Sequence, residues 1–180
     1  SMKRQSQILL LKVSLVGITP KIWRALLVPN DATFFDLHVW LQAAMGWTDS
    51  HLHQFWTTRP YSRGERGPLI SYPYPEMDDR EETIDERKEK LSIWLAEPKV
   101  KLWYEYDFGD GWMHEIILKK ILPKEKEGVM PRVVAGARAC PPEDCGGVPG
   151  YENLCEVLTD PKHSGHRELT RWLGEIGMSD

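Results

Sequence analysis

The stretch YEYDFGDGWMHEI, residues 104–116, decides the fold of this chain. Its first residues alternate between aromatic and polar, which is the period of a β-strand with one buried face. The Asp110-Gly111 dipeptide in the middle is typical of a type I′ turn joining two antiparallel strands. The stretch therefore predicts a β-hairpin with strands near residues 100–108 and 112–122.

The length of the turn sets which residues of the hairpin face one another. A two-residue turn places Asp107 opposite His114, with Cβ atoms about 4.5–5.5 Å apart. A three-residue loop, 109–111, would instead place Tyr106 opposite His114. A carboxylate beside an imidazole selects one tautomer and raises its basicity, which suits a general base or a metal ligand. We take Asp107, His114 and Asp110 as candidate catalytic residues; an ion pair or half-buried histidine with no function is the simpler alternative.

Two more histidines extend this hypothesis toward a metal site. His51 and His53 are two residues apart, so both would project from the same face of a strand. With His114 they form a candidate ligand set for a divalent ion such as zinc, next to Asp107. The spacing leaves open a metal site, a metal-free ligand or catalytic site, and purely structural roles.

Candidate ligand-binding residues come from the tryptophans and from one loop. The chain has eight tryptophans, and we expect Trp47 and Trp112 to form apolar walls of a pocket, although an aromatic core explains them more simply. Prolines and glycines make residues 141–150 irregular, and this loop brings Asp144 and Cys145 as candidates. For Cys145 a buried thiol is favoured over a nucleophile.

The remaining periodicities predict an α+β fold, with a mainly antiparallel sheet or open barrel packed by about four helices. Thr33 followed by Asp36 resembles a capping box, and Gly46 is suited to end the helix that begins there. Further strands are expected at residues 7–16, 21–28, 51–58 and 129–140, and further helices at residues 87–97 and, twice, after residue 150.

Composition limits the functional classes. The chain of 180 residues has a net charge of −4, which argues against nucleic-acid binding. Three cysteines and no long apolar run predict a reduced cytoplasmic protein without a membrane span. We expect one domain over residues 7–176, a tag remnant and flexible N-terminus at 1–6, and a tail at 177–180. A small molecule or a protein is the expected partner.

Four segments together resemble the plasmid pRiA4b open-reading-frame-three-like family, in the family's order. They cover residues 17–29 (GITPKIWRALLVP), 33–55 (TFFDLHVWLQAAMGWTDSHLHQF), 102–116 (LWYEYDFGDGWMHEI) and 139–151 (ACPPEDCGGVPGY). The resemblance implies an uncharacterised protein associated with plasmids or other mobile elements, without established catalytic residues. Some members carry resolvase labels, but the negative charge and the lack of a basic recognition helix argue against a recombinase.

Two functional hypotheses follow. The first is a ligand pocket lined by the Asp–His pair and the His51/His53 strand, with metal-assisted or general-base hydrolysis as the reaction class if the protein is an enzyme. The second is a protein–protein interaction module of a plasmid or transposon system, which would use the acidic segment 76–90 and exposed aromatic residues.

Overall fold

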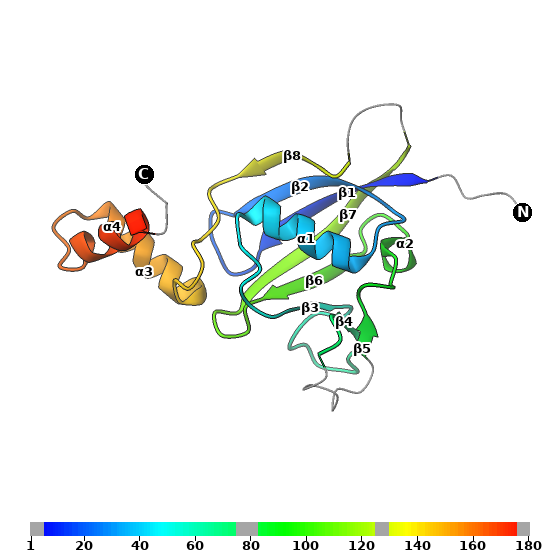
Figure 1. The fold of residues 1–180 in the computed structure, drawn as a ribbon, viewed down its shortest axis with the longest axis horizontal. Coiled ribbons are helices and arrows are strands. Elements are labelled where there is room, and N and C mark those ends of the chain that lie inside the picture. The colour runs from blue at the N-terminus through cyan, green and yellow to red at the C-terminus, as the bar shows by residue number, and fades with distance from the viewer. Residues whose placement is uncertain (1–5, 75–82, 125–129, 176–180) are drawn as a thin grey trace, which may run out of the picture.

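The protein is an α+β fold, seen in a computed structural model that describes residues 6–74, 83–124 and 130–175 (Figure 1). The predicted fold class is confirmed. The strands are β1 (Gln7–Leu15), β2 (Trp23–Pro29), β3 (His53–Trp56), β4 (Leu69–Ser71), β5 (Thr83–Asp85), β6 (Lys101–Tyr106), β7 (Trp112–Pro123) and β8 (Arg132–Ala137). The helices are α1 (Phe34–Met45), α2 (Leu91–Trp94), α3 (Gly147–Thr159) and α4 (His166–Glu175).

All described strands join one open eight-stranded sheet in the order β5-β4-β3-β6-β7-β1-β2-β8. Every neighbouring pair is antiparallel except β4 and β5, which run parallel. Strand β6 lies between β3 and β7, so the hairpin of β6 and β7 occupies the middle of the sheet rather than an edge. None of the described helices is long and apolar enough to cross a membrane.

Helix α1 covers one face of the sheet (Figure 1). The predicted capping box is present: the Thr33 hydroxyl accepts a hydrogen bond from the Asp36 backbone N–H at 3.1 Å, and the Thr33 N–H donates to the Asp36 carboxylate at 3.0 Å. Gly46 ends the helix in the left-handed conformation, with φ 75°. The helix buries an apolar stripe against the sheet, which includes Phe34, Leu37 and Leu41.

The register of the hairpin corrects the predicted Asp–His pair. Tyr106 lies opposite Trp112 and Tyr104 lies opposite His114, so the connection spans the five residues 107–111. Asp107 therefore sits in the turn and not across the ladder from His114. Both predicted turn lengths, two residues and three, are wrong.

The carboxylate of Asp107 explains why the turn is longer. Asp107 adopts a left-handed backbone conformation with φ 62°, and its Oδ1 accepts hydrogen bonds from the N–H groups of Gly109 at 3.1 Å and Asp110 at 3.2 Å. Its carbonyl accepts from the Gly111 N–H at 2.5 Å. The aspartate thus satisfies the loop amides with its own side chain, as aspartates commonly do in turns, and a tight two-residue turn is not needed.

The N-terminus of α3 rests on this turn. The Gly146 N–H donates to the Asp110 carboxylate at 3.2 Å. Gly147 has φ 69°, and a Cβ atom added there would lie 2.2 Å from the Asp110 carbonyl oxygen. Only a glycine permits this approach, because both the contact and the left-handed backbone exclude a side chain. Helices α3 and α4 then extend to one side of the sheet (Figure 1).

Gly147→Ala should separate α3 from the hairpin turn and lower the free energy of unfolding by about 1–3 kcal/mol, because the backbone must shift or bear strain. Urea denaturation measures the change. Gly174→Ala in α4 is the matched control: no atom lies within 4 Å of an added Cβ there, so we expect a gain of about 0.5–1 kcal/mol. Equal effects of the two substitutions would contradict this account of the turn.

Candidate functional site

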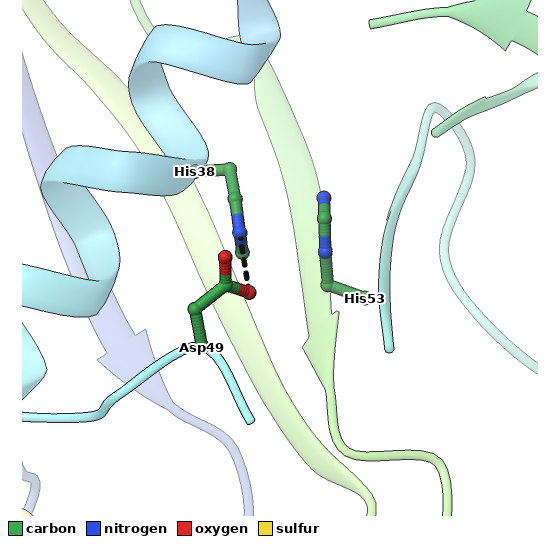
Figure 2. A group of neighbouring side chains, drawn as sticks. All are labelled: His38, Asp49 and His53. Carbon is green, nitrogen blue, oxygen red and sulfur yellow. Dashed lines mark hydrogen bonds and ion pairs between the residues drawn. The ribbon is translucent and has the colours of Figure 1, made fainter. Parts of the chain in front are cut away.

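A pocket of about 490 Å³ opens beside α1 and the start of β3. Its polar end is formed by one residue from α1, His38, one from the loop after α1, Asp49, and the first residue of β3, His53 (Figure 2). The whole lining consists of Phe35, His38, Asp49, Ser50, His51, Leu52, His53, Tyr72 and Tyr74.

The two imidazole rings of the pocket stack face to face. The ring centroids of His38 and His53 are 3.4 Å apart and their planes differ by 6°. Oδ1 of Asp49 lies 2.9 Å from Nε2 of His38. Figure 2 marks this contact with a dashed line. One donor atom from each of the three residues lies within 4.8 Å of the other two. Two ring nitrogens and a carboxylate oxygen thus lie close together at the polar end of the pocket.

A hydrogen-bond chain orients His38. The backbone N–H of Asp49 can only donate, so the Gln42 atom that it meets at 2.8 Å is the amide oxygen. The Gln42 NH₂ group then donates to the Tyr104 hydroxyl at 2.9 Å, which leaves that hydroxyl's proton for Nδ1 of His38 at 2.7 Å. In this arrangement His38 carries its own proton on Nε2 and donates it to Asp49.

His53 is held by a different carboxylate. Its Nε2 lies 2.7 and 3.0 Å from the two oxygens of Glu86, which is completely buried. An ionised carboxylate can only accept, so Nε2 carries the proton. Nδ1 of His53 is buried and has no hydrogen-bond partner among the described residues. Because the proton is on Nε2, Nδ1 has a free lone pair at the polar end of the pocket. A buried acceptor without a partner costs free energy.

The electrostatics favour the neutral form of His38. Burial and, to a smaller extent, the adjacent imidazole of His53 lower the pKa of His38 to about 4, against the opposing effect of Asp49. A second positive charge next to a stacked imidazole is repelled. His38 is therefore uncharged at neutral pH, which is the form of histidine that binds metals.

A second group of candidate ligands consists of His51, Asp107 and Asp144. Nε2 of His51 is 2.9 Å from Oδ1 of Asp144 and 3.5 Å from Oδ2 of Asp107, and the three donor atoms lie within 4.8 Å of one another. The structure thus brings together one predicted residue from each of three segments: the stretch before β3, the hairpin turn and the loop before α3. This group is more open to solvent than the first, with 67% of the Asp144 side chain exposed.

The predicted ligand set His51, His53 and His114 does not assemble. Strand β3 begins at His53, so His51 precedes the strand and the two side chains join different groups. His114 is completely buried in the core, where its Nδ1 lies 2.9 Å from the Tyr104 carbonyl oxygen. The predicted strand began two residues too early, at His51, and His114 points into the core, away from both groups.

Three polar residues of the site were missed from the sequence: His38 and Asp49, which line the pocket, and Glu86, which holds His53 from behind. One signal was available, because His38 lies at helical spacing from Phe34 and Leu41 on the buried stripe of α1. A histidine on such a face needs a polar partner. Nothing local identifies Glu86, which lies within an acidic segment that reads as a solvated surface.

The predicted wall residues Trp47 and Trp112 belong to the core and do not line the 490 Å³ pocket. The indole N–H of Trp47 donates to the Pro141 carbonyl at 3.0 Å, and its ring stacks on Tyr106 and Trp112 with centroids 4.9 and 6.1 Å away.

Burial, aided by the neighbouring Asp110, raises the pKa of the Cys145 thiol to about 12. That thiol stays protonated at neutral pH, which does not suit a nucleophile.

Comparison with known proteins identifies the family. The family model described as plasmid pRiA4b ORF-3-like protein matches residues 7–178. The chain belongs to this family. A relative in Sinorhizobium fredii, named uncharacterized protein y4hQ, is 37% identical over 166 residues, which is 91% of this chain and 79% of the relative. The predicted resemblance is confirmed.

A solved structure supports the same assignment. The crystal structure of a protein of unknown function, MM3350 from Methanosarcina mazei Go1, is 40% identical and has a TM-score of 0.82. The match covers 95% of this chain and 92% of that one. Neither name states an activity, so membership of the pRiA4b ORF-3-like family defines the fold of the chain and not its chemistry.

Acid should destabilise the protein through His114. Burial lowers its pKa from 6.5 to about 4 in the folded state, so between these values the unfolded chain binds a proton that the folded protein does not. Stability present above pH 6.5 is therefore lost as the pH falls toward 4. From pH 7 to pH 5 the loss through this residue is about 2 kcal/mol.

Urea denaturation at pH 7 and pH 5 measures this loss of stability. In His114→Gln the free energy of unfolding should fall by about 2 kcal/mol less between the two pH values than in the wild type. His163→Gln, at an exposed histidine, should keep the wild-type slope. An unchanged slope in the His114 variant would show that other groups carry the acid sensitivity.

Proposed function

We propose that the 490 Å³ pocket binds a divalent metal ion through His38, Asp49 and His53. The supporting observation is the buried Nδ1 of His53, which has no described partner and lies in a group whose donor atoms are within 4.8 Å of one another. Two imidazoles and a carboxylate are a common ligand set for zinc and for other first-row divalent metals. A metal ion would give the orphaned nitrogen its missing partner.

The surroundings of the two histidines match those of metal ligands. A ligating histidine usually directs its second ring nitrogen to a carboxylate or another fixed polar group, which sets the tautomer and raises the basicity of the ligating nitrogen. Glu86 stands in this position for His53, at 2.7 Å. For His38 the Tyr104 hydroxyl, 2.7 Å from Nδ1, would take this role once the ring proton moves to Nδ1 and is donated to the hydroxyl oxygen, which frees Nε2 for the metal. Both partners are completely buried, so neither contact exchanges readily with water.

The rest of the pocket has room for a small organic substrate. Its volume lies in the range of ligand sites, and Phe35, Tyr72 and Tyr74 supply aromatic walls. His38, Asp49 and His53 would supply three ligands, and a metal ion held by them would activate water and polarise a carbonyl or phosphoryl group. We therefore propose metal-assisted hydrolysis of a small molecule as the reaction class.

The interaction-module hypothesis receives less support. It relied on the acidic segment 76–90, of which residues 76–82 lie outside the described part of the chain. In the described part, Glu86 points inward to His53, and Asp85 binds the guanidinium of Arg87 through both carboxylate oxygens, at 3.1 and 2.9 Å. These carboxylates serve the fold and do not form an open acidic surface.

Isothermal titration of zinc into chelator-treated protein, purified without a nickel column, tests the site. Wild type should bind one equivalent, and His53→Gln should abolish that binding. Glu86→Gln removes only the partner of His53, and the affinity should fall about 10–100-fold. His51→Gln is the matched control from the neighbouring group and should bind as wild type does. Loss of binding in this control with retention in His53→Gln would move the ion to the His51 group.

The reaction class is tested separately with chromogenic substrates. Hydrolysis of p-nitrophenyl acetate and p-nitrophenyl phosphate should depend on added zinc or manganese. Asp49→Asn should lower kcat/KM at least about 100-fold, because the variant loses a metal ligand and with it the activation of water by the metal. The control His163→Gln should keep full activity. Zinc binding without hydrolysis of either substrate would retain the metal site and overturn the hydrolase assignment.

A further inference from the structure

The sheet face opposite α1 carries a row of tryptophans. Side chains alternate along a strand, and Tyr104, Tyr106 and His114 point toward the core under α1, so their strand neighbours point the other way. On this face the strand registers align one residue from each of five neighbouring strands, three of them tryptophans: Trp56, Trp103, Glu115, Ser14 and Trp23.

A pocket of about 340 Å³ lies over the middle of this face. Its floor is formed by side chains of β6 and β7, and its walls come from the loop after β3 and from the hairpin turn. The lining residues are Val16, Arg59, Pro60, Tyr61, Trp103, Glu105, Phe108, Gly111, Met113 and Glu115. Three aromatic rings and two carboxylates thus share one hollow.

The carboxylate of Glu105 is the most unusual group in this pocket. Its side chain is 6% exposed, and its Oε1 accepts a hydrogen bond from the Gln54 NH₂ group at 2.7 Å. No lysine or arginine of the described chain forms an ion pair with it. Buried carboxylates are normally paired with a cation. Of the two carboxylates in the lining, Glu115 pairs with Lys101 at 3.5 Å, and Arg59 is the one cationic side chain among the lining residues.

The same face already holds cations on its tryptophans. The Arg66 guanidinium lies over the ring of Trp56, 5.7 Å from the centroid, and Nζ of Lys12 lies over Trp23 at 4.8 Å. Trp103 stands between these two tryptophans in the row, and no cation of the described chain lies over it. Such contacts stabilise because the face of an indole ring is electron-rich.

We propose that this second pocket binds an organic cation of the trimethylammonium class. The rings of Trp103, Tyr61 and Phe108 would contact its methyl groups, and Glu105 would supply the counter-charge. A trimethylammonium group has no N–H to donate, so it needs aromatic faces and a nearby negative charge rather than hydrogen-bond acceptors. The site lies on the opposite face of the sheet from the metal pocket and does not depend on it.

Choline and its neutral carbon isostere, 3,3-dimethyl-1-butanol, are the probes that test this proposal by NMR titration. Wild type should bind choline at least about 5-fold more tightly than the isostere, because only choline gains the cation–π and charge terms. Equal binding of the two probes, or no binding of choline, would overturn the proposal.

Variants locate the site. Glu105→Gln keeps the size of the side chain and should reduce the choline preference while binding of the isostere stays unchanged. Trp103→Leu should weaken choline at least about 5-fold. Trp23→Leu removes a tryptophan from the same row outside the pocket and should bind choline as wild type does. An unchanged preference in Glu105→Gln, or equal losses in the two tryptophan variants, would contradict the assignment.

A peptide carrying trimethyllysine distinguishes the two sources of this chemistry. If it binds more tightly than choline, the pocket recognises a methylated protein segment; if it binds less tightly, the ligand is a small molecule. Either result supports a trimethylammonium site, and failure of both probes to bind overturns it without bearing on the metal site.

Discussion

The register of β6 is the constraint on which the rest of this structure depends. The strand is paired on both sides, with Tyr106 opposite His53 on β3 and Tyr104 opposite His114 on β7. This pairing puts the tyrosines and histidines on the face that α1 covers, and Trp103 and its neighbours on the other. A slip of one residue would exchange the two faces. Both proposed sites would be lost together, because each is built from one side of the same strand.

A cluster of buried polar groups occupies the α1 face at a cost in stability. His38, His53 and Glu86 are almost entirely enclosed, and moving imidazole and carboxylate groups out of water is unfavourable unless each finds a partner. Three of the four ring nitrogens have partners: Tyr104 and Asp49 hold His38, and Glu86 holds Nε2 of His53. Nδ1 of His53 has no partner among the described residues. Apolar residues in the same space would cost less free energy of desolvation. Titratable groups with a shifted pKa in a pocket commonly mark a functional site.

The hairpin turn connects the two faces. Phe108 and Gly111 line the pocket on the tryptophan side, while Asp107 contacts His51 and Asp110 anchors the loop before α3. The Asp107 carboxylate accepts hydrogen bonds from two amides of the turn and so stabilises its conformation. The turn therefore supports the pocket on the tryptophan side and the His51 group, whose residues come from distant parts of the chain.

Much of the fold could be predicted from the sequence because its signals are local. The alternation in YEYDFGDGWMHEI determined the hairpin, the Thr33 and Asp36 pair and Gly46 determined the ends of α1, and the order of elements determined the α+β class. The site could not be predicted in this way. Asp107 was matched with His114 on turn statistics, whereas its carboxylate bonds to its own loop. The carboxylate–imidazole pairs of the metal pocket join residues 11 and 33 positions apart, and His51 pairs with Asp144 from a third segment. Only tertiary structure selects such partners, because a buried imidazole takes whichever carboxylate the packing of α1 on the sheet brings within reach.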